Sequence, residues 1–137
     1  MKYVEYLKIP FKHLGRDYSG ADCFGLLRLF YQKELNVILK DFTNYSEDWA
    51  KKGKNYFLEM YREWGFSRVS KGNFKFGDAV LFKTNNVISH VGIVLDDIYF
   101  IHMSKKGCSI HSYIDGEWGC RLFGAFRYIK RNRKNDN

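Results

Sequence analysis

The stretch DYSGADCFGLLRLFY, residues 17–31, places a cysteine between a run of small and polar residues and an apolar run. The residues just before Cys23 are of the types that end a loop and begin a helix. From Cys23 onward, leucine and phenylalanine recur at helical spacing, and Asn36 follows the segment. The pattern predicts a helix from about Cys23 to Leu35, with the thiol in its first turn.

A thiol in the first turn of a helix lies beside unpaired backbone N–H groups and the positive end of the helix dipole. Both favour the thiolate, which is the form of cysteine that acts as a nucleophile. Free cysteine is also among the most buried residue types. This stretch alone therefore leaves two interpretations of Cys23 open, a nucleophile and a core thiol.

The whole chain has the length and composition of a single folded domain. It has 137 residues, of which 45% are hydrophobic, 18% aromatic and 28% charged. These values favour a packed globule, which we expect to span residues 1–129. Three cysteines without paired spacing do not indicate a disulfide framework, and no N-terminal stretch has the pattern of a signal peptide or a membrane span. We therefore expect synthesis in the cytoplasm.

The formal net charge of +8 favours an anionic partner. Nucleic acid, a membrane surface and an acidic cell-wall polymer all fit that sign. Much of the excess lies near the end of the chain, where we interpret residues 130–137 as a basic, flexible tail. No basic and aromatic motif of a known nucleic-acid module is present, so specific nucleic-acid binding is the least favoured class.

Periodicity divides the rest of the chain into helices followed by strands. Residues 1–16 predict an irregular lead-in that contains Pro10, and the segment from about Glu47 to Trp64 predicts a second helix that ends at Gly65. After Gly65 the pattern alternates and indicates short strands within residues 78–82, 87–95, 98–103, 108–114 and 121–129. The order predicts an α+β domain in which an antiparallel meander packs on the cysteine-bearing helix.

A cysteine nucleophile needs a base and a group that orients the base, and two strand histidines are candidates. His90 and His102 lie on successive predicted strands joined at Asp96-Asp97. In an ideal hairpin centred there, the two histidines point to opposite faces. A one-residue bulge or a three-residue turn brings them to one face, so we predict an irregularity between Leu95 and Phe100. The alternative for either histidine is a satisfied polar residue on the sheet surface.

Three stretches, in order along the chain, carry a family resemblance. DCFGLLRLFY (22–31), FKFGDAVLF (74–82) and SHVGIVLDDIYFIHM (89–103) resemble the cysteine, Gly-Asp and histidine motifs of the NlpC superfamily of cell-wall cysteine peptidases. The stretch GRDYSGADCFGLLRLFY (15–31) is similar to the subgroup found in tail proteins of tailed bacteriophages.

The resemblance implies a papain-like α+β fold and hydrolysis of peptide bonds in peptidoglycan stem peptides. It also implies a triad in which Cys23 attacks the carbonyl carbon, His90 exchanges the proton and His102 orients His90. No cofactor is implied. The cysteine and histidine spacings match no zinc pattern, so we expect no metal and interpret Cys108, His111 and Cys120 as structural.

Polar residues near the motifs are candidates for substrate binding. Many members of the family have a tyrosine twelve residues before the cysteine, where this chain has Phe11. Tyr18 or Ser89 could supply the missing hydroxyl. Asp22 is a candidate for binding a substrate amine, and a helix cap is the alternative for it.

Three functional classes remain open, of which a nucleic-acid binder ranks lowest. The first is a cysteine endopeptidase acting on peptidoglycan stem peptides, incorporated in a virion tail. The second is a tail assembly or structural protein that uses the same domain for interaction with tail proteins or for cleavage of one. Turnover separates these two classes, because an assembly function tolerates loss of the thiol.

Overall fold

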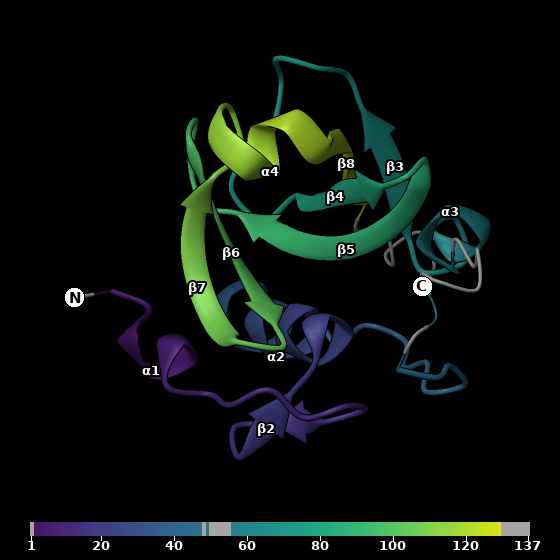
Figure 1. Ribbon diagram of the computed structural model, residues 1–137. Helices are drawn as coiled ribbons and strands as arrows, with labels where there is room; N and C mark the ends of the chain where they lie inside the picture. The colour runs from purple at the N-terminus through teal and green to yellow at the C-terminus, as the bar shows by residue number, and fades with distance from the viewer. Residues whose placement is uncertain (1, 48, 50–55, 130–137) are drawn as a thin grey trace.

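The structure is a computed structural model that describes residues 2–47, 49 and 56–129 (Figure 1). The predicted basic tail at 130–137 lies outside the described residues. The helices are α1 (Val4–Leu7), α2 (Cys23–Leu35), α3 (Tyr56–Met60) and α4 (Gly116–Arg121). The strands are β1 (Arg16–Asp17), β2 (Gly20–Ala21), β3 (Phe66–Val69), β4 (Ala79–Thr84), β5 (Val87–Val94), β6 (Tyr99–Ser104), β7 (Gly107–Ser112) and β8 (Leu122–Tyr128). The predicted α+β class is confirmed.

Helix α2 has the bounds that the sequence predicts, and local signals fix both ends. The Asp22 side chain accepts a hydrogen bond from the Gly25 amide at 2.9 Å and caps the first turn. At the other end, Asn36 adopts the left-handed conformation, with φ of 57°, and the Val37 amide donates to the Tyr31 carbonyl. The helix therefore begins at Cys23 because its N-cap is Asp22.

The second predicted helix forms only in part, and the described residues Glu47 and Trp49 at its predicted start lie in turns. Of the predicted span 47–64, residues 48 and 50–55 lie outside the described residues, and α3 covers Tyr56–Met60. The helix ends at Met60, four residues before the predicted end at Trp64, and turns follow up to Gly65. Gly65 has φ of 94°, the Gly65 amide donates to Arg62, and the Phe66 amide donates to Tyr61. This pattern is a Schellman motif, in which glycine at the left-handed position stops the helix.

The N-terminal segment differs from the predicted irregular lead-in. It contains the single helical turn α1, in which Tyr6 is buried. The Tyr6 hydroxyl donates to the Glu34 carboxylate at 2.8 Å, and its ring centroid lies 5.2 Å from that of Phe30 on α2. Packing on α2 thus orders a turn that is too short to be recognised from periodicity. Within the described residues, no helix is long and apolar enough to cross a membrane.

The main sheet, as far as the chain is described, has the antiparallel order β3-β8-β4-β5-β6-β7, beside a small β1-β2 pair. The predicted meander is confirmed for β4 to β7. It is wrong for β8, which lies between β4 and β3, and β3 itself was not predicted. Helix α4 separates β7 from β8 and returns the chain to the β4 edge, where β8 gains a partner on each side.

Apolar side chains cover both faces of this sheet. The larger cluster lies between the sheet and α2 and includes Leu26, Phe30, Val91 and Ile93. A smaller cluster on the other face contains Phe82 and Phe100, with Trp118 of α4 packed against it. Figure 1 shows α2 and α4 on opposite sides of the strands. The start of α2 reaches β5, so the thiol and the strand histidines come from two layers that meet there.

Candidate active site

The hairpin between β5 and β6 contains the irregularity that the sequence predicts. Gly92 pairs with His102 and Val94 with Phe100. The pairing continues to Leu95, whose amide donates to the Tyr99 carbonyl at 2.9 Å, and leaves a three-residue turn. This turn shifts the register by one residue from the ideal hairpin, so His90 and His102 point to the same face.

The two histidines are buried and in direct contact. His90 Nε2 lies 2.7 Å from His102 Nδ1. Only 8% of His90 and 1% of His102 is exposed. Gly92, opposite His102, keeps the space for this side chain, because a Cβ at residue 92 would lie 3.1 Å from His102 Cβ and 2.6 Å from the Phe100 ring. A small residue at 92 is therefore required by close packing.

A second irregularity, in β5, sets the direction of His90. Phe82 pairs with His90 and Lys83 with Ile88, so Ser89 is an extra residue. Ile88 packs in the cluster on the α2 side, whereas the ring centroid of His90 lies 6.3 Å from that of Phe82 in the other cluster. The bulge thus gives Ile88 and His90 different environments although they are two residues apart.

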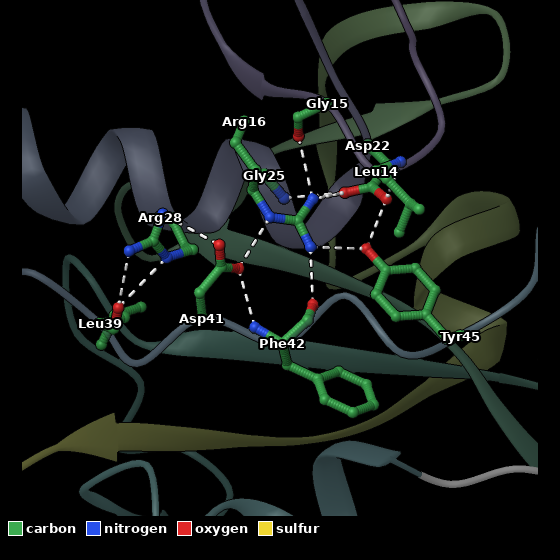
Figure 2. Close-up of polar contacts among 10 residues, drawn as sticks. All are labelled: Leu14, Gly15, Arg16, Asp22, Gly25, Arg28, Leu39, Asp41, Phe42 and Tyr45. Carbon is green, nitrogen blue, oxygen red and sulfur yellow. Dashed lines mark hydrogen bonds and ion pairs between the residues drawn. The ribbon is translucent and has the colours of Figure 1, made fainter.

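A hydrogen-bond network around Asp22 and Arg16 holds the start of α2 (Figure 2), where Cys23 is the first helical residue. Asp22 is buried and accepts from the Leu14 amide at 2.9 Å, from Arg16 Nη1 at 2.9 Å and from the Tyr45 hydroxyl. Arg16 also donates to the Phe42 carbonyl at 2.7 Å, which ties residues 41–45 to the same point. The first turn of α2, and with it the thiol, has a fixed position.

A cleft of about 270 Å³ lies where these two parts of the molecule meet. Its walls include Cys23 and Tyr45 on the α2 side, and His90, Trp118 and Arg121 on the sheet side. The cleft is the space that a substrate chain needs between a nucleophile and a base. The structure therefore brings the predicted nucleophile and the predicted base to one concave surface.

Burial disfavours the charged forms of Cys23, His90 and His102. It raises the pKa of Cys23 to about 12, with a further increase from Asp22, while the Val91 amide lowers that pKa. Burial also lowers the pKa of His90 to about 3, and Arg121 adds to the effect. The pKa of His102 falls to about 2 through burial and its neighbours His90, His111 and Arg121. Loss of solvation therefore exceeds the helix dipole at Cys23.

The predicted substrate-binding residues are placed differently from one another. The Asp22 carboxylate lines the cleft, but its oxygens already accept four hydrogen bonds, as expected for the helix-cap alternative. Ser89 lines the cleft and receives a hydrogen bond from Arg121 Nη2 at 3.3 Å. Tyr18 is 45% exposed, its ring lies tilted with its centroid 6.3 Å from that of Tyr6, and it is not among the residues that line the cleft.

Several residues at the site were not identified from the sequence. Tyr45 lines the cleft, its hydroxyl donates to Asp22, and burial together with Asp22 raises the pKa of that hydroxyl. Trp118 and Arg121 lie on α4, a segment whose glycines indicate a turn. His111 on β7 lies beside His102, although the sequence interpretation made it purely structural. The two-residue turn after Ser104 is the signal that could have predicted this contact. With that turn, His102 pairs with Ser109, and His111, two residues further along β7, lies diagonal to His102 on the same face.

The histidine nitrogens bond to one another and do not converge on a common point. Among the residues that the structure describes, no group of three or more histidine, cysteine or acidic side chains is arranged to hold a metal ion. The polar atoms at the cleft instead suit proton transfer between neighbouring side chains.

Comparison with known proteins agrees with this arrangement. Residues 8–127 match the NlpC/P60 family. A relative in Escherichia coli, the murein DD-endopeptidase MepS/murein LD-carboxypeptidase, is 24% identical over 132 residues, which are 96% of this chain and 62% of that protein. The chain therefore spans less than two thirds of the length of this relative. The family resemblance predicted from the sequence is confirmed, and the phage-tail subgroup stays a prediction.

Solved structures of the same family share the fold. A lipoprotein-like NLP/P60 protein of Staphylococcus aureus superposes with a TM-score of 0.65 at 21% identity, covering 93% of this chain and 39% of the other. The NlpC/p60 domain of the peptidoglycan hydrolase SagA gives a TM-score of 0.62 at 20% identity and covers 91% of each chain. The predicted NlpC-type fold is confirmed.

Proposed function

Because the chain belongs to the NlpC/P60 family, we propose that it is a cysteine endopeptidase that hydrolyses peptide bonds in peptidoglycan stem peptides. The observation that carries this proposal is the cleft in which Cys23 and His90 share one surface, with His90 hydrogen-bonded to His102. The relatives named as a murein endopeptidase and a peptidoglycan hydrolase support the substrate class.

The proposed reaction begins with transfer of the Cys23 thiol proton to His90. Nε2 of His90 is bound to His102, so Nδ1 is the nitrogen that accepts this proton. The thiolate attacks the carbonyl carbon of the scissile bond, and the C–N bond breaks as His90 returns the proton to the leaving amine. Water then hydrolyses the thioester, its proton passing through His90, and regenerates the thiol.

The negative charge on the carbonyl oxygen needs donors at the start of α2. The amide of Cys23 lies in the first helical turn, where backbone N–H groups have no carbonyl of the preceding turn to bond. We assign the oxyanion to this amide. Burial raises the pKa of Cys23 and lowers that of His90, so the proposed reaction starts from the neutral thiol and the neutral imidazole.

We further propose that the enzyme is made in the cytoplasm and incorporated in the tail of a bacteriophage virion. The support is the resemblance of residues 15–31 to the tail-protein subgroup. A tail assembly or structural protein, which binds tail proteins or cleaves one of them, is the alternative. The test of turnover below separates it from the enzyme.

Digestion of purified peptidoglycan, with fragments identified by mass spectrometry, tests the enzymatic proposal. We expect the wild type to release stem-peptide fragments and Cys23→Ala to release none while melting at a similar temperature. Cys120→Ala is the matched control, because this thiol is exposed on α4, and it should retain full release. Equal release by the Cys23→Ala protein would refute the nucleophile assignment, and no release by the wild type would favour the assembly alternative.

A further inference from the structure

The histidine pair continues into a third histidine. His102 Nε2 lies 2.8 Å from His111 Nδ1 on the neighbouring strand β7. The Ser109 hydroxyl lies farther away, 3.4 Å from the same nitrogen of His102. His111 is exposed whereas His102 is almost completely buried. A row of imidazoles therefore runs from the cleft to the surface.

Proton positions along this row are coupled, because a neutral imidazole carries a single N–H. To take the thiol proton at Nδ1, His90 must carry its own proton on Nε2 and donate it to His102 Nδ1. His102 then carries its proton on Nε2, and this buried N–H needs an acceptor, which His111 Nδ1 supplies.

The opposite arrangement would prevent the reaction. With a donor at His111 Nδ1, the proton of His102 would move to its own Nδ1 and be donated to His90 Nε2. His90 would then carry its proton on Nδ1, and that nitrogen would have no lone pair left to accept the thiol proton of Cys23. The group at residue 111 thus selects between a competent and an incompetent state of His90.

The surroundings of the three histidines strengthen the effect of the His102–His111 hydrogen bond on the tautomer of His102. The indole of Trp118 covers the rings, with centroids 5.1 Å from His90, 4.7 Å from His102 and 6.2 Å from His111. Arg121, also on α4, stacks on that indole with its guanidinium carbon 4.4 Å from the centroid, and contributes positive charge. Water is kept from His102, so its N–H depends on its protein neighbours.

We propose that His111 is a positioning residue that holds His102 in the Nε2–H tautomer and thereby keeps Nδ1 of His90 ready to accept the thiol proton. The catalytic consequence rests on the proposed peptidase function. The Ser109 hydroxyl cannot replace His111, since it is more distant and can donate as readily as accept.

Tautomers and rates provide independent tests. Protein with ¹⁵N-labelled histidine, studied by long-range proton–nitrogen NMR at pH 7.5, should show Nε2–H at His102 in the wild type and in His111→Asn, whose amide oxygen can accept in place of Nδ1. His111→Leu should show a mixture with Nδ1–H. On a defined stem peptide, His111→Leu should lower kcat by about tenfold with KM nearly unchanged, and His111→Asn should recover most of the loss.

Ser109→Ala is the matched control on the same strand, and its kcat should stay within about twofold of the wild type. A proton on Nδ1 of His102 in the wild type would overturn the inference, as would a His111→Leu protein with an unchanged tautomer. If His102 keeps its tautomer in the His111→Leu protein, the role of His111 is purely structural. If the wild type fails to cut any stem peptide, the proposed function is wrong, and the NMR result still decides whether His111 controls His102.

Discussion

The buried histidine pair should make the stability of the protein depend on pH between 5 and 7.5. Burial lowers the pKa of His90 to about 3 and that of His102 to about 2, whereas both titrate near 6.5 in the unfolded chain. Below 6.5 the unfolded chain binds protons that the folded chain does not. The contribution is therefore fully present above pH 6.5 and is lost as the pH falls toward 3.

The expected loss follows from this difference in pKa. Each unit of pH below 6.5 costs about 1.4 kcal/mol for each histidine, so lowering the pH from 7.5 to 5 costs roughly 2 kcal/mol for one histidine and about 4 kcal/mol for the pair. Carboxylates with lowered pKa values, such as Asp41, change stability below their unfolded pKa of 3.8, outside this range. His90 and His102 therefore dominate the pH dependence of stability between pH 5 and pH 7.5.

Urea unfolding at pH 7.5 and pH 5 measures this loss. His102→Asn should roughly halve it, because one buried histidine then remains. Cys23→Ala is the matched control: its loss should equal that of the wild type if the resting thiol and His90 are neutral. A wild-type difference below about 1 kcal/mol would refute the reasoning, since it would mean that the folded protein already holds a charged imidazole.

Substitutions at three positions test other parts of the site. His102→Ala should lower kcat much more than it raises KM, and His102→Asn, whose amide oxygen can accept from His90, should recover part of the loss; unchanged steady-state rates would place the orienting group elsewhere. Gly92→Ala, whose Cβ would lie 3.1 Å from that of His102, should lower the free energy of unfolding by about 1–3 kcal/mol and reduce kcat, and an unaltered melt would contradict the close packing. Asp22→Ala removes the cap of α2 and the buried partner of Arg16, which keeps Asp41, and should cost about 3 kcal/mol in urea unfolding; a loss near zero would show that the buried Asp22 network contributes little.

Signals within a few residues were sufficient to predict α2. Asp22 caps one end and Asn36 ends the other, and both act on their immediate neighbours. The helix stop at Gly65 was predicted for the same reason, and the structure forms it as a Schellman motif. Such contacts hardly depend on the rest of the chain, so the sequence specifies them directly.

The register of the β5–β6 hairpin was predicted from chemistry and not from turn residues. Asp96-Asp97 alone indicates an ideal hairpin, which separates His90 from His102. The need to bring both to one face required an irregularity, and the three-residue turn provides it. Here the functional hypothesis, and not the turn residues, led to the correct structural prediction.

The sequence by itself determined the helix that carries Cys23, the strands that carry His90 and His102, and the family. Only the tertiary structure decided that β8 inserts beside β4 and that α4 places Trp118 over the histidines. These features depend on contacts between residues far apart in the chain, whose pairing no local periodicity specifies. Burial, which sets the protonation of the site, likewise arises only when the layers pack together.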